Sequence, residues 1–168
     1  GVYLVASWPG GCKAWQKADW AWLAGLPVLL WPDCDAKREK LTHAERTACA
    51  DEAERDMLQA SKPLLPEHKQ PGVAAMLGIG RHLMQAHGCT VHMLRIPAPG
   101  LVPDGWDCGD AIHTDGWDSA RVLAFFGTAH AIPPADAENA PSGPPDAAVG
   151  KKIDGPVGTE SGGDGQSP

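Results

Sequence analysis

Aromatic residues other than tryptophan are nearly missing from this chain of 168 residues, which has one Tyr and two Phe beside seven Trp. The chain also lacks any run of the roughly 18 apolar residues that a membrane helix needs. Its first residues, GVYLVASWPGG, have neither a basic segment nor a long apolar core. These absences argue against a membrane-bound protein and against a secretory signal. We therefore expect a cytoplasmic protein with no membrane partner.

No CxxC pair occurs among the cysteines, and their number is odd: Cys12, Cys34, Cys49, Cys89 and Cys108. This pattern argues against a zinc knuckle and against a disulfide framework, and it suits a reducing compartment. None of the seven His has zinc-ligand spacing to another His or to a Cys. The candidate ligands that remain are carboxylates.

The net charge of −7 is distributed unevenly along the chain. The segment 131–168 has six acidic residues and two lysines, is rich in Pro, Gly and Ser, and has almost no large apolar residue. Such a composition buries too little apolar surface to offset the entropy of ordering. We expect an α/β domain over 1–130, with an insertion or helical crossover at 36–70, and a disordered tail or linker over 131–168.

The hydrophobic pattern predicts alternating strands and helices. We expect strands at 2–6, 27–31 and 90–96, and helices at 43–61, 71–88 and 118–126. Thr42 and Glu45 have the spacing of a capping box at the start of the first helix. Strands joined by helical crossovers predict an α/β fold with a mainly parallel sheet flanked by helices.

Two aspartates one residue apart follow the most apolar of these strands, in the sequence PVLLWPDCD. Ligands of open α/β sheets bind beyond the carboxyl ends of the strands. Asp33 and Asp35 could both point at one Mg²⁺, which commonly uses one or two carboxylates together with water and phosphate. An equally good interpretation is that Asp33 caps a turn and Asp35 begins the next element.

Basic side chains follow the two aspartates at once and could contact phosphate oxygens. They are Lys37, Arg38 and Lys40, and a solvated charge run is the alternative interpretation. Lys13 follows the pair Gly10–Gly11, which permits close backbone approach to a ligand but also suits a plain tight turn.

A second acidic segment, PDGWDCGDAI, follows the third expected strand. It should therefore reach the same edge of the sheet as Asp33. Asp107 and Asp110 are three residues apart and would share a face if a helix begins there. The alternative is that Asp107 caps a short helix.

Together, the motifs SWPGGCKAW, WPDCD, VHMLRIP and DGWDCGDAI resemble the Toprim-like domains of primase and primase–helicase proteins carried by phages, plasmids and other mobile elements. The resemblance covers about residues 2–127. It implies a compact Toprim-like α/β fold and binding of Mg²⁺ or Mn²⁺ by Asp33 and Asp35. It also matches Asp107 and Asp110 to an acidic segment of the primase members.

The resemblance further implies nucleotidyl transfer in primer synthesis, with DNA and nucleotides as substrates and a helicase or other replication module in the same parent protein. The acid/base glutamate of the family is expected upstream of Gly1, so the residues printed here are expected to be inactive without it. The segment 36–70 is an insertion relative to the usual family pattern.

Other functions fit the same residues. A Toprim nuclease would use the same metal site to hydrolyse DNA. A catalytically inactive module would bind bases or a partner protein through a tryptophan-rich face made of Trp8, Trp15, Trp20, Trp22 and Trp31. An aspartate-nucleophile phosphatase also has a D-x-D after its first strand, but Ala36 and Lys37 do not fit its usual pattern.

Overall fold

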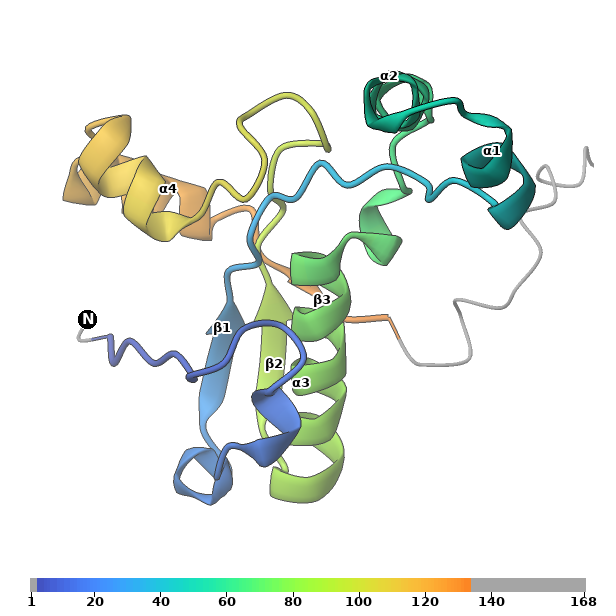
Figure 1. The fold of residues 1–168 in the computed structure, drawn as a ribbon. Coiled ribbons are helices and arrows are strands. Elements are labelled where there is room, and N and C mark those ends of the chain that lie inside the picture. The colour runs from blue at the N-terminus through green and yellow to red at the C-terminus, as the bar shows by residue number, and fades with distance from the viewer. Residues whose placement is uncertain (1–2, 134–168) are drawn as a thin grey trace, which may run out of the picture. The chain divides into compact units, whose positions relative to one another are not determined.

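The computed structural model describes residues 3–133, all of which belong to one compact unit, Gly1–Glu138 (Figure 1). The helices are α1 (His43–Ala48), α2 (Glu52–Ser61), α3 (Pro71–His87) and α4 (Ser119–Phe126). The strands are β1 (Pro27–Leu30), β2 (Thr90–Met93) and β3 (His130–Ala131). Short 3₁₀ turns cover Trp15–Lys17, Ala21–Leu23 and Glu67–Lys69, and a π turn covers Asp110–Thr114. None of the helices described is long and apolar enough to cross a membrane.

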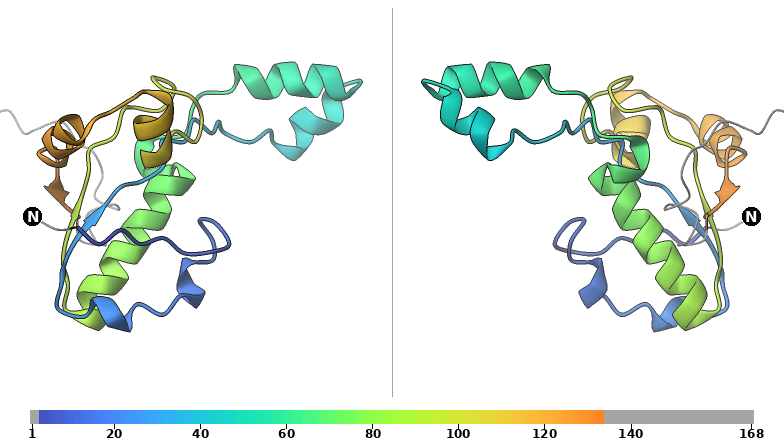
Figure 2. Two further views of the ribbon diagram at one scale, coloured as in Figure 1. Left: turned by 90° about the vertical axis from the view of Figure 1, so that its left-hand side faces the viewer. Right: turned by 90° about the vertical axis from the view of Figure 1, so that its right-hand side faces the viewer.

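The strands form one mixed sheet in the order β1-β2-β3. β1 and β2 are parallel, with Pro27 opposite Thr90 and Leu30 opposite Met93. β3 is antiparallel to β2 and was not predicted. The expected α/β fold is thus confirmed in its general form, with α3 as the crossover helix that lies against the sheet (Figure 2).

The prediction of a strand at 2–6 is wrong for residues 3–6, the part of this segment that the structure describes. Residues 3–7 form no ladder, and Tyr3, Leu4 and Val5 are 59, 78 and 87% exposed. An apolar run becomes a strand only where another strand pairs with it. Apolar composition was therefore a poor guide here.

Helix α3 supplies more residues of the buried core than any other helix or strand that the structure describes. Pro71 occupies its first turn and Gly88 ends it in the left-handed conformation, as the sequence predicted. Leu83 and Ile79 are almost wholly inaccessible to solvent. At Gly80 a Cβ would lie 2.1 Å from Cδ1 of Ile132, so the Ile132 side chain packs against the backbone of α3 and would have to shift for any larger residue.

The sheet and core extend past the boundary expected at residue 130. Ala131 belongs to β3, and Ile132 is buried. The remainder of the expected tail, from residue 134, lies outside the described residues.

The tryptophans do not form the exposed face considered above. Trp20 belongs to the core, and Trp8, Trp15 and Trp31 pack against it. Trp22 is half exposed and is the exception. The structure therefore places these rings mainly in packing roles.

The single helix expected at 43–61 is two helices. The capping box of Thr42 and Glu45 opens α1 as predicted. A second cap was missed: Asp51 accepts a hydrogen bond from the Glu54 N–H, and the Glu54 carboxylate accepts one from the Ala50 N–H. These two hydrogen bonds satisfy backbone N–H groups at the start of a new helix at Glu52 and explain the break.

These two helices belong to an excursion, residues 36–70, that extends away from the sheet. The two ends of the excursion are joined to each other. Arg38 and Leu64 pair as an isolated antiparallel bridge. The buried side chain of Gln70 accepts a hydrogen bond from the Lys37 N–H and donates one to the Leu65 carbonyl. Figure 2 shows α1 and α2 extending away from the sheet beyond this closure.

Candidate acidic site at the carboxyl end of β1

Two acidic segments meet beyond the end of β1, as the sequence predicted. The Cys34 N–H donates to the Trp106 carbonyl over 2.7 Å, and the Gly105 N–H donates to the Cys34 carbonyl over 2.9 Å. This pairing brings PDCD against PDGWD. Asp33, Asp35, Asp104 and Asp107 therefore flank one backbone bridge.

Asp35 has a structural role. The residue is buried, with 9% relative exposure, and its Oδ2 accepts a hydrogen bond from the Gly72 N–H over 2.6 Å. Gly72 is the second residue of α3, so the carboxylate lies at the positive end of the helix dipole. Its other oxygen is 4.0 Å from the Lys37 Nζ. Asp35 thus joins the end of β1 to the start of α3.

Asp33 differs from Asp35 in having no hydrogen-bond donor from residues 3–133 on its carboxylate, although it is half-buried. Partial burial raises the pKa of Asp33, and the nearby charges of Asp107 and then Asp35 raise it further. Its backbone lies tightly against α3, since a Cβ at Gly72 would lie 2.6 Å from the Asp33 carbonyl oxygen. A bound cation would stabilise the charged form of this carboxylate.

Asp107 and Asp110 cap one another. Oδ1 of Asp107 accepts the Asp110 N–H over 3.0 Å, and Oδ2 of Asp110 accepts the Asp107 N–H over 3.2 Å. The capping interpretation of Asp107 is therefore confirmed. Its Oδ2 accepts no hydrogen bond from the part of the chain described, and its charge still acts on Asp33. Asp110 lies further along the same short helical turn.

Lys37 is held beside this site by a partner that the sequence did not reveal. Its Nζ donates to Oδ2 of Asp104, whose Oδ1 accepts the Ala36 N–H over 2.7 Å. The hydrogen bond from Lys37, together with that from Ala36, lowers the pKa of Asp104. The same hydrogen bond raises the pKa of Lys37. Only the pairing of the two distant segments brings these residues together.

The other predicted basic residues are divided between the site and the excursion. Lys13 is exposed in the turn after Gly10 and Gly11, both of which have positive φ. Burial raises the pKa of the neighbouring Cys12 thiol, as do the charges of Asp33 and Asp35, so this turn lies near the acidic site. Arg38 donates to the Lys62 carbonyl, and Lys40 is exposed on the excursion.

The carboxylates of Asp33 and Asp107 suit a cation whose other ligands come from substrate and water. Among residues 3–133, no group of three or more His, Cys, Asp or Glu side chains is placed to hold a metal ion. Mg²⁺ commonly binds proteins through one or two carboxylates and completes its shell with water and phosphate. Asp33 and Asp107 fit that mode, because each has carboxylate oxygen that accepts no hydrogen bond from the described chain.

In comparisons with known proteins, the chain matches no protein-family model, no curated protein and no solved structure. The resemblance to Toprim domains therefore depends on the sequence motifs alone.

Proposed function

We propose that this domain is a Toprim-type module that binds Mg²⁺ or Mn²⁺ and handles nucleotide phosphates, as part of a DNA primase. The observation that carries the proposal is the state of Asp33: a half-buried carboxylate with a raised pKa, no hydrogen-bond donor among residues 3–133, and a second carboxylate, Asp107, close enough to raise that pKa. A carboxylate in this position is unfavourable unless a cation joins it.

The residues of the acidic site would have different roles. Asp33 and Asp107 would hold the ion, which supplies stabilisation of charge on a phosphate. Asp35 would not need to bind it directly, because its hydrogen bond to Gly72 fixes the backbone that presents Asp33. Lys37, fixed by Asp104, lies within 4.0 Å of Asp35 and adds positive charge at the same edge. The exposed Lys13 belongs to the turn on the other side.

A second candidate function is a catalytically inactive Toprim-like module. It is favoured by the engagement of Asp35 and Asp110 in structural hydrogen bonds, which leaves few carboxylate oxygens for catalysis. A Toprim nuclease would share the cation site of the primase and is separated from it by products: extension of an oligonucleotide or its cleavage.

The cation site is tested by counting free Mn²⁺ with electron paramagnetic resonance during a titration of the protein. We expect saturable binding that Asp33→Asn or Asp107→Asn weakens at least tenfold. Asp19→Asn removes an exposed carboxylate near the second 3₁₀ turn and is the matched control, with binding unchanged. Equal binding by all four proteins would exclude the site. Binding without any nucleotide transfer or cleavage would favour the inactive module.

A further inference from the structure

We propose that the excursion, residues 36–70, binds a single-stranded polynucleotide along α2, in a cationic groove that ends at the acidic site. The claim that the strand is led to the acidic site rests on the proposed function. The claim that the groove binds a single strand does not.

The groove consists of two hollows that share Asp56 and Gln59 and therefore lie beside each other along α2. The hollow of about 380 Å³ between α1 and α2 presents His43, Arg46 and Arg55. The hollow of about 800 Å³ between α2 and the closure of the excursion presents Lys37, Arg38 and Lys40. Asp56 is the one acidic residue in either lining, against five Lys and Arg. A protein of net charge −7 thus concentrates positive charge here.

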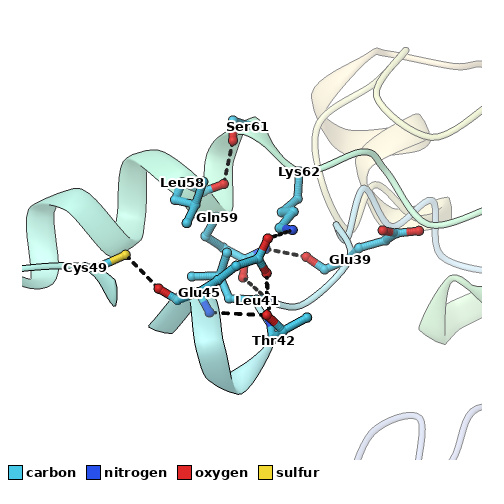
Figure 3. A network of polar contacts seen from close by, with 9 residues as sticks. All are labelled: Glu39, Leu41, Thr42, Glu45, Cys49, Leu58, Gln59, Ser61 and Lys62. Atoms are coloured by element: carbon cyan, nitrogen blue, oxygen red, sulfur yellow. Dashed lines mark hydrogen bonds and ion pairs between the residues drawn. The ribbon is translucent and has the colours of Figure 1, made fainter. Parts of the chain in front are cut away.

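Several of these cations are left uncompensated. Arg46, Arg55 and Lys40 form no ion pair with any residue from 3 to 133. Glu45, the acidic residue nearest to Arg46 in sequence, is instead engaged by Lys62 and by Thr42 (Figure 3). An excess of positive charge that is only partly neutralised attracts a polyanion, and backbone phosphates meet this requirement.

A polar network holds the groove in shape without using these cations. Gln59 donates through Nε2 to the Glu39 carbonyl over 2.7 Å, and its Oε1 accepts the Leu41 N–H over 3.3 Å (Figure 3). These bonds fix α2 to the segment that carries Lys40. The cations are therefore presented on a defined scaffold, although neither helix of the excursion contains a buried residue.

The lining of the groove favours a single strand. The lining of its larger hollow includes Ala36, Ala60 and Leu65, against which bases can lie, together with cations that can meet the phosphates. The bases of a duplex are stacked in its interior, so apolar side chains beside cations suit the exposed bases of a single strand better. The same hollow is lined by Pro71, the neighbour of the Gly72 that binds Asp35, so a strand following it reaches the acidic site.

The test is fluorescence anisotropy of a labelled oligothymidylate of about 12 nucleotides, a length suited to single-strand binding surfaces. EDTA is present throughout, so that the metal site makes no contribution. Arg46→Gln/Arg55→Gln should weaken binding at least tenfold and lower the slope of log K against log salt by about 1.4, the value for two lost phosphate contacts. The matched control is Lys17→Gln/Arg95→Gln, which removes the same charge from exposed positions elsewhere. It should change binding less than twofold.

Three results would overturn the proposal: no oligonucleotide binding by the wild-type protein, equal losses in the two double variants, or tighter binding of a duplex of equal length. A synthetic peptide of the acidic segment 134–168 serves as a competitor. Displacement of the oligonucleotide by an equal concentration of this peptide would assign the groove to the protein's own acidic segment. EDTA removes the metal ion from this assay, whereas the Mn²⁺ titration contains no oligonucleotide, so failure of the metal site and failure of the groove are separate outcomes.

Discussion

The packed layer of α3 and the sheet differs from the excursion of α1 and α2 in what holds it together. The first is built on buried apolar residues such as Ile79, Leu83 and Leu94. The second has no buried residue in either helix and depends on helix caps, a Glu45–Lys62 ion pair and the hydrogen bonds of Gln59 (Figure 3). Apolar burial stabilises a whole domain, whereas polar contacts on a small excursion stabilise it only locally.

The candidate acidic site lies at the joint between these two regions. Asp35 binds the amino end of α3, and Lys37 begins the excursion. The proposed polynucleotide surface is therefore carried by the less stable region, and the proposed cation site by the more stable one. Substitutions in the two regions should have effects of different size and extent.

The largest effect is expected from Leu83→Ala in α3. The side chain is fully buried, so its truncation leaves a cavity and should destabilise the domain by about 2–5 kcal/mol. Met57→Ala in α2 is the control from the excursion, because Met57 is 76% exposed and should lose less than about 0.5 kcal/mol. Urea unfolding followed by far-UV circular dichroism measures both. Similar losses in the two variants would abolish the distinction between the regions.

Gly72→Ala tests the contact between the start of α3 and the acidic site. The new Cβ would lie 2.6 Å from the Asp33 carbonyl oxygen, a backbone atom that cannot move without displacing the acidic segment. We expect a loss of about 1–3 kcal/mol and weaker Mn²⁺ binding. Gly78→Ala in the same helix meets the Trp15 ring at 2.8 Å instead, so it should reduce stability without affecting Mn²⁺ binding. Equal Mn²⁺ affinity in both variants would show that the Asp33 backbone position is unimportant.

Thr42→Ala should loosen only the excursion. It removes the side chain that accepts the Glu45 N–H at the start of α1, at a cost of about 1 kcal/mol. Hydrogen exchange should become faster in the amides of α1 and remain unchanged in α3. Thr47→Ala, later in α1, removes a hydroxyl that donates to the His43 carbonyl within the same helix and is the control. Faster exchange throughout α3 would indicate that the two regions unfold together.

A smaller, pH-dependent effect is expected from Glu45. The hydrogen bond from Lys62, with those from the backbone and hydroxyl of Thr42, lowers the pKa of Glu45 from 4.5 to about 2. A carboxyl whose pKa is lower in the folded state stabilises the fold above its unfolded pKa, and this contribution is lost as the pH falls toward 2. Exchange of α1 amides, corrected for intrinsic rates, should accelerate between about pH 4.5 and 2. Glu45→Gln should lack that transition; its persistence would assign the transition to another group.

The sequence predicted those parts of the fold that local signals determine. The limits of α3 followed from Pro71, Gly88 and the apolar spacing between them. β3 was missed because two residues, His130 and Ala131, carry no periodicity, and only their position beside β2 makes them a strand. Tyr3–Val5 had the composition of a strand but no partner among the described residues.

The candidate site was predicted in its position more than in its roles. That Asp33 and Asp107 would meet followed from both being placed beyond strand ends. The separate role of Asp35 depends on Gly72, 37 residues later, arriving beside it. Likewise, Lys37 and Asp104 are 67 residues apart and are joined only by the folded backbone. Such contacts leave no pattern in a single sequence.

The central claim is that one carboxylate of the D-x-D pair is free for a cation and the other holds the fold. It is tested most directly by urea unfolding of Asp33→Ala and Asp35→Ala at pH 7 in EDTA. The raised pKa of Asp33 means that its ionised form destabilises the domain as the pH rises through that pKa, so Asp33→Ala should increase the free energy of unfolding. Asp35→Ala should lower it by about 1–3 kcal/mol, because the Gly72 N–H loses its buried acceptor. Opposite signs would support the account, and losses of equal size in both variants would contradict it.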